Sequence, residues 1–145
     1  MTITKKMIAL NLNVAVPRSS KDTLAGIAHL PRMIDKARSL RNNTLGEYIY
    51  PCPLDLHVFN FLQADPEDFA DLAEVNDDAQ MAEWTEEAGR SRTGEERDLL
   101  NRKILDRKPD AETMAEFLDQ RNQIDPTRAD VTTWADLRDL EEGHI

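Results

Sequence analysis

One short stretch, residues 46–57 (GEYIYPCPLDLH), gathers side chains that can do chemistry. It holds the only cysteine of the chain, Cys52, together with both tyrosines and one of the three histidines. If Pro53 opens a helix, Cys52 occupies the N-cap position, where free amide groups and the helix dipole stabilise a thiolate. The carboxylate of Asp55, at the third helical position, opposes that effect. The stretch therefore predicts either a reactive thiol or a small buried side chain.

A cysteine nucleophile needs a base within hydrogen-bond reach. His57 lies five residues after Cys52, so it does not sit directly over the thiol on a helix surface. The fold would have to bring His29 or His144 to the thiol. The candidate catalytic residues are Cys52, His29 and His57, and together they do not form a complete catalytic set. The sequence favours a non-enzymatic binding or interaction module, with an enzyme or redox sensor based on Cys52 as the alternative.

A second set of polar residues is suited to an anionic ligand. His29 precedes a predicted helix on which Arg32 and Lys36, four residues apart, are expected to share an outward face. In the EYIY segment, alternation places both tyrosines on one side, where hydroxyl groups can orient a small molecule. A solvated ion-pair ladder and core-packed tyrosine rings are the structural alternatives. The predicted ligand-binding residues are His29, Arg32, Lys36, Glu47, Tyr48 and Tyr50.

Metal and cofactor motifs are missing from the sequence. The three histidines share no ligand spacing with Cys52. One Glu-x-x-His pattern, from Glu141 to His144, supplies half of the pair that a di-iron bundle requires. With five glycines, and neither a phosphate-binding loop nor a G-x-S-x-G motif, the sequence predicts no metal and no cofactor.

The elements that must position these residues are short helices. In residues 29–43 (HLPRMIDKARSLRNN), Pro31 suits the first turn, apolar residues recur with helical spacing, and the asparagines provide a stop. Further helix starts are indicated by Asp65 before Pro66 and by a capping box from Thr93 to Glu96. The last predicted helix carries a tryptophan and ends near residue 143.

The first part of the chain gives weaker signals. Residues 1–16 alternate in hydrophobicity without a second run to pair with, which favours an extended arm. A first helix is expected over residues 21–28 with Ser20 as its cap. We predict an all-α fold, a compact irregular (orthogonal) bundle of about seven or eight short helices. Residues 1–145 are expected to form a single domain, with the arm preceding a helical body over residues 17–145.

Charge is divided unevenly along the 145 residues. The net charge is −10, but residues 1–50 carry eight lysines or arginines against three acidic residues. The basic part can complement the acidic remainder or bind an anion, whereas overall acidity disfavours nucleic acid. The sequence lacks an apolar run of about 18 residues, which disfavours a membrane partner, and a single cysteine is typical of a reducing cytoplasm. A protein partner stays open, as does the oligomeric state.

Two motifs also resemble a known family. The LPRMIDKAR segment (residues 30–38) and the GEYxYxCPLD segment (residues 46–55) look like those of a bacterial family described as a domain of unknown function. A PRS turn (residues 17–19) and a tryptophan-bearing acidic C-terminus extend the resemblance over most of the chain. It implies no reaction, ligand or partner, but it directs attention to the same two segments.

Overall fold

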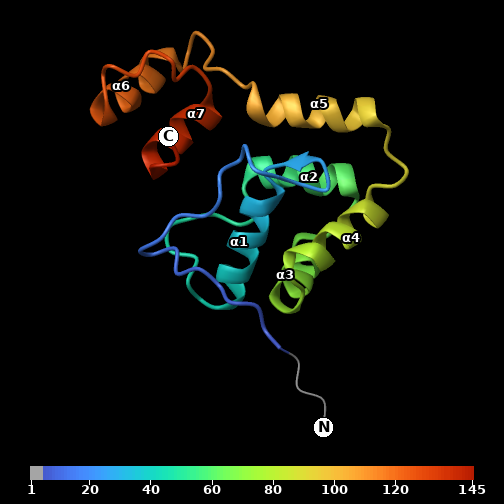
Figure 1. Cartoon of the computed structure of the whole chain (residues 1–145). Helices are drawn as coiled ribbons and strands as arrows, with labels where there is room; N and C mark the ends of the chain where they lie inside the picture. Colours follow the sequence, from blue (N-terminus) through green and yellow to red (C-terminus); the bar gives the residue numbers. More distant parts are fainter. Residues whose placement is uncertain (1–4) are drawn as a thin grey trace.

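Seven helices of 9 to 12 residues and one small hairpin form the described part of the chain, residues 5–145 of a computed structural model. Figure 1 shows their arrangement. The elements are β1 (Thr23–Leu24), β2 (Ile27–Ala28), α1 (Leu30–Arg41), α2 (Pro53–Leu62), α3 (Pro66–Val75), α4 (Asp78–Ala88), α5 (Gly94–Leu105), α6 (Met114–Ile124) and α7 (Trp134–Glu142). The predicted bundle of short helices is confirmed.

Most helix ends follow the local sequence signals. Cys52 is the N-cap of α2, and Asp65 caps α3 by accepting hydrogen bonds from two first-turn amides. Thr93 and Glu96 form the expected capping box at α5. Gly143 ends α7 in the left-handed conformation, with a φ of 79°.

The predicted helix over residues 21–28 is wrong, because this segment forms the antiparallel hairpin β1–β2. Ala25 and Gly26 both have positive φ, as a tight two-residue hairpin turn requires. Asn101 of α5 fixes the turn, since its amide donates to the carbonyl of Gly26 and its oxygen accepts from the amide of Ala28. A contact 73 residues away in sequence thus overrides the local helix signal.

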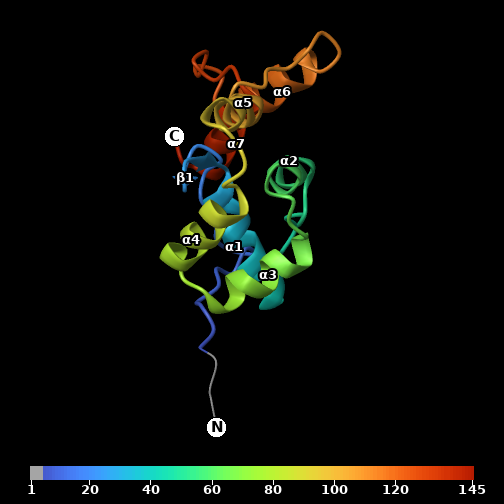
Figure 2. The same ribbon diagram turned by 90° about the vertical axis from the view of Figure 1, so that its right-hand side faces the viewer.

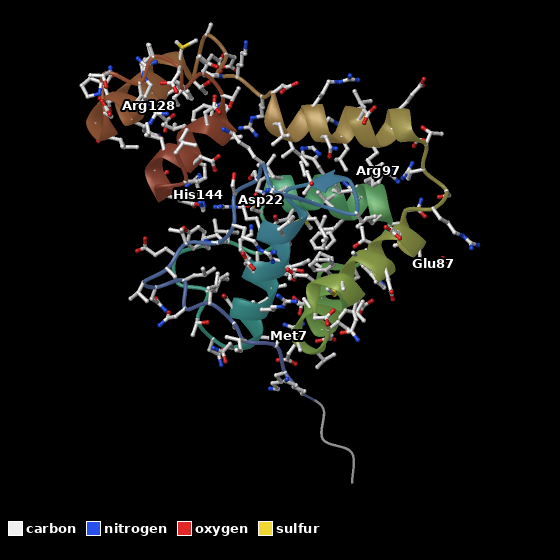
Figure 3. The ribbon with its side chains drawn as sticks, in the orientation of Figure 1. Met7, Asp22, Glu87, Arg97, Arg128 and His144 are labelled. Carbon is white, nitrogen blue, oxygen red and sulfur yellow. The ribbon has the colours of Figure 1, made fainter. Side chains whose placement is uncertain are left out.

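Helices α1 to α5 enclose the main core. Its fully buried side chains include Leu30 and Met33 of α1 and Phe69 of α3. The aromatic rings of Tyr50, Phe59, Phe69 and Trp84 follow one another through this core with edge-to-face contacts. Figure 3 shows side chains filling the space between α1, α2, α3 and α4.

Helices α6 and α7 build a second, smaller core around Phe117, Val131, Leu137 and Leu140. This core lies beyond one end of α5, on the side away from α3 and α4 (Figures 1 and 2). Polar contacts connect it to the main body, and we call them the polar joint. They are Ser19 to Asp139 at 2.6 Å, Lys21 to Asp136 at 2.6 Å, Arg32 to Glu142 at 2.7 Å and His144 to the carbonyl of Pro17 at 2.9 Å.

The expectation that Arg32 and Lys36 face solvent is wrong. Arg32 is 5% exposed and Lys36 is 2% exposed, because the rest of the fold encloses α1 on nearly all sides. Both cations are paired with carboxylates from the acidic part of the chain, Arg32 with Glu142 and Lys36 with Asp55. The basic first part of the chain therefore forms ion pairs with the acidic remainder within the fold.

The N-terminal arm packs against the turn that follows α1. The amide of Leu12 donates to the carbonyl of Thr44 over 2.8 Å. Gly46 lies opposite with a φ of 64°, and a Cβ there would meet the carbonyl oxygen of Leu12 at 2.7 Å. Only glycine fits this approach. Residues 1–4 of the predicted arm fall outside the described part. Within residues 5–145, no helix combines the length and the apolar character needed to cross a bilayer.

Candidate functional site

A cavity of about 490 Å³ lies between the main core and the small core. Its volume falls within the range of about 300–1,000 Å³ that is usual for small-molecule sites. Residues of both cores line it, with His29, Arg32 and Lys36 on one side and Trp134 and Arg138 on the other. Arg32 is the residue of the polar joint that lines the cavity, and the two cores together define its shape.

The floor of the cavity is a continuous chain of polar contacts, which we call the floor network. Ser20 Oγ lies 2.8 Å from His29 Nδ1, and His29 Nε2 lies 2.7 Å from Asp55 Oδ1. The other oxygen of Asp55 accepts from Lys36 Nζ at 2.7 Å, and the same ammonium group contacts Cys52 Sγ at 3.4 Å. One fully buried carboxylate thus connects a hydroxyl, an imidazole, an ammonium group and a thiol.

Two helix starts position the floor network. Cys52 and Asp55 are the N-cap and third residue of α2, and Asp55 Oδ2 accepts from the backbone amide of Cys52 at 2.9 Å. His29 is the N-cap of α1 and adopts the left-handed conformation, with a φ of 76°. Such a backbone is uncommon for a residue with a side chain and is found preferentially at functional sites.

Burial and hydrogen bonding set the charges in the floor network. Burial alone would raise the pKa of Asp55, but the hydrogen bond from His29 and the positive charge of Lys36 lower it to about 2. Burial lowers the pKa of His29 below its usual 6.5, and this outweighs the opposing effect of Asp55. At neutral pH the site therefore contains an ionised carboxylate beside a neutral imidazole.

The lowered pKa of Asp55 predicts a specific loss of stability in acid. Because the folded-state value of about 2 lies below the ordinary 3.8, this stabilisation is present above pH 4 and is lost as the pH falls toward 2. The full difference corresponds to about 2 kcal/mol, of which about 1 kcal/mol disappears between pH 5 and pH 3. Urea denaturation of the wild type and of Asp55→Asn should show their stability difference narrowing by that amount. A difference that stays constant over this pH range would contradict the assignment.

The floor network also contains potential metal ligands. One donor atom from each of His29, Cys52 and Asp55 lies within 4.8 Å of the other two. Nitrogen, sulfur and oxygen donors of this kind suit zinc. However, Lys36 Nζ contacts the carboxylate and the thiol directly, so an ammonium group already supplies the positive charge among these ligands. A metal could enter only by displacing Lys36.

A second buried group lies at the edge of the cavity. Arg32 donates to both carboxylate oxygens of Glu142 at 2.7 Å, and its guanidinium group lies 5.5 Å from the ring centre of Tyr48. The hydroxyl of Tyr48 donates to the same carboxylate at 3.0 Å. Burial and the negative charge of Glu142 raise the pKa of Tyr48 to about 12, so the phenol stays protonated.

The structure brings most of the predicted site residues together. His29, Arg32, Lys36, Glu47, Tyr48 and Cys52 all line the cavity. Tyr50 instead packs on Phe59 and donates to the carbonyl of Pro66. His57 is half-buried on α2 and lies outside the lining that the described residues form.

Sequence reasoning missed Ser20, Arg107 and Glu142, and it treated Asp55 only as an unfavourable charge. Asp55 is the last residue of the second motif and Ser20 lies ten residues before the first, and only the fold shows that both bind His29. Arg107 follows α5, and Glu142 ends α7. Neither shows a local pattern that distinguishes it from the many charged residues nearby.

Comparison with known families supports the resemblance of the two motifs. Residues 14–144 match a family described as domain of unknown function DUF5069. The chain belongs to the DUF5069 family. The match covers the hairpin, all seven helices and every residue of the floor network. A search of curated proteins finds none that this DUF5069 chain matches.

Proposed function

We propose that the cavity binds a small organic anion, with its apolar part between the two cores and its charged group near Arg107 and Arg138. The observation that carries this proposal is the cavity itself, which combines buried polar side chains on its floor with apolar and aromatic walls. Its apolar lining includes Ile49, Leu54 and Ile104.

The position of the anionic group follows from which cations are already paired. Arg32 and Lys36, the residues first predicted to bind it, are neutralised by Glu142 and Asp55. Arg107 is exposed, lines the cavity and makes no ion pair with any residue of the described chain. Its guanidinium group lies 6.0 Å from the ring centre of Trp134. Arg138 is paired with Glu141 in an exposed contact, which holds it weakly.

Phenyl phosphate and benzoate are suitable probes, since each combines an apolar ring with one anionic group. At ten times its dissociation constant a ligand stabilises the folded state by about 1.4 kcal/mol, which raises the melting temperature by about 3–5 °C at this chain length. Inorganic phosphate and phenol, which each offer one half of the probe, should give smaller shifts.

Replacing Arg107 with glutamine is expected to weaken phenyl phosphate binding about tenfold, the effect of losing one charge-assisted hydrogen bond. Titration calorimetry would measure it. Arg102→Gln is the matched control, because Arg102 is also exposed, on the last turn of α5, and lies outside the described lining. The proposal fails if neither probe binds at millimolar concentration, or if both variants bind like the wild type.

A further inference from the structure

The hydrogen positions in the floor network follow from its hydrogen-bond geometry. The carboxylate of Asp55 accepts from the ammonium group of Lys36 and from the amide of Cys52. It is therefore also the acceptor for His29 Nε2, 2.7 Å away, which places the hydrogen of the neutral imidazole at Nε2. Nδ1 then carries a lone pair and accepts from the hydroxyl group of Ser20 at 2.8 Å. This is the polarity that allows a histidine to remove the proton from a serine.

We propose that the cavity is a hydrolase site in which Ser20 is the nucleophile and His29 its general base, acting on small carboxylic esters that carry an anionic group. The inference rests on the anion-binding pocket proposed above, which would orient the ester. Both Ser20 and His29 are among the residues that line the cavity in which a substrate would bind.

The reaction proceeds in two steps, acylation of Ser20 and hydrolysis of the acyl group. Ser20 Oγ bonds to the carbonyl carbon of the ester while its proton moves to His29 Nδ1, and that proton then passes to the leaving alcohol as the carbon–oxygen bond breaks. Water next loses a proton to His29 and attacks the acyl group. The carboxylic acid leaves as Ser20 recovers its proton. Asp55 keeps the ring oriented and stabilises the positive charge that His29 acquires.

The local backbone brings the side chains of Ser20 and His29 into contact. The hairpin β1–β2 returns the chain so that the amide of His29 donates to the carbonyls of Ser20 at 2.9 Å and of Asp22 at 3.1 Å. These bonds hold His29 in its left-handed conformation. An uncommon backbone geometry is thus maintained at the residue that connects the hydroxyl to the carboxylate.

Ser19 offers a matched comparison within the same turn. It is as buried as Ser20, at 7% against 6% exposed, but its hydroxyl donates to Asp139 at 2.6 Å. The partner of Ser19 is therefore a buried carboxylate and not an imidazole, and Ser19 lies outside the described lining of the cavity. Two adjacent serines therefore differ in the one property that the proposal requires.

The test uses the full-length chain and two probes. With 4-acetoxybenzoate, an ester that carries a carboxylate, the wild type should release 4-hydroxybenzoate. Diisopropyl fluorophosphate should form a phosphorus–oxygen bond to Ser20 with loss of fluoride, and peptide mass spectrometry would locate the adduct. Ser20→Ala should abolish the adduct and lower ester hydrolysis at least 100-fold, the lower end of what a positioned base contributes. Ser19→Ala should retain both reactions.

His29→Gln provides a second variant, because its amide can still donate to Asp55 but cannot accept the serine proton. The His29→Gln variant should lower the rates of ester hydrolysis and of adduct formation about 100-fold, while its melting temperature shows that it is folded. Three outcomes would overturn the proposed hydrolase activity. They are hydrolysis that persists in Ser20→Ala, an adduct on Cys52, and a wild type that reacts with neither probe. If phenyl phosphate still binds through Arg107 in that last case, the binding pocket stands alone; if it does not bind, both proposals fail.

Discussion

Replacing Asp55 with asparagine is expected to reduce the free energy of unfolding by about 3–5 kcal/mol, the usual effect of removing one partner from a buried ion pair. Asp55 is fully buried and accepts from His29, from Lys36 and from the amide of Cys52. Without it, the ammonium group of Lys36 keeps the carbonyl oxygen of Ile49 and the thiol as neighbours but loses its countercharge.

Urea denaturation at pH 7 would measure this loss, with Asp98→Asn as the control. Asp98 is exposed on α5, so its substitution should change stability by less than about 0.5 kcal/mol. A double variant, Asp55→Asn with Lys36→Met, should be more stable than Asp55→Asn alone, because it removes the uncompensated charge. An Asp55→Asn protein as stable as the wild type would show that Lys36 does not depend on this carboxylate.

Replacing Arg32 with methionine should have the second-largest effect, a loss of about 3 kcal/mol. The change removes both hydrogen bonds from Arg32 to Glu142, whose side chain is 4% exposed. It leaves that carboxylate with the hydroxyl of Tyr48 and with His144, whose Nε2 lies 3.4 Å away. Because this pair belongs to the polar joint, the loss should be concentrated where α7 meets the main body. Amide hydrogen exchange should become faster in α7 while α1 and α3 remain protected.

Arg90→Met is the control for this prediction. Arg90 forms an exposed pair with Glu87, with side chains 77% and 72% exposed, and such pairs contribute little. Its substitution should leave both stability and the exchange pattern of α7 unchanged. Uniformly faster exchange in Arg32→Met, in α3 as much as in α7, would indicate that the polar joint does not separate two units.

The helices could be predicted because their starts and ends are encoded by neighbouring residues. Asp65, Thr93 and Gly143 act on amide or carbonyl groups within three or four positions, so their roles are readable from the sequence. The hairpin could not be predicted, since its turn is fixed by Asn101 on a distant helix.

For the candidate site, the sequence indicated the segments that line the cavity but not the full set of residues in it. Both motifs mark the floor of the cavity, because the N-caps of α1 and α2 carry His29 and Cys52. The burial of Lys36 was not foreseen, since a helix with charges on one side usually exposes that side to water. Here the charged side faces other polar residues, and a hydrophobicity pattern does not distinguish these two environments.

The polar joint holds together the two cores that lie on either side of the cavity. A site within one apolar core is bordered by packed side chains alone, whereas this one lies between two cores that ion pairs and hydrogen bonds hold together. Salt weakens such contacts at the surface and acid neutralises their carboxylates. A ligand that touches both walls would therefore act as one more cross-link between the cores, and its affinity would vary with ionic strength even if the ligand were uncharged.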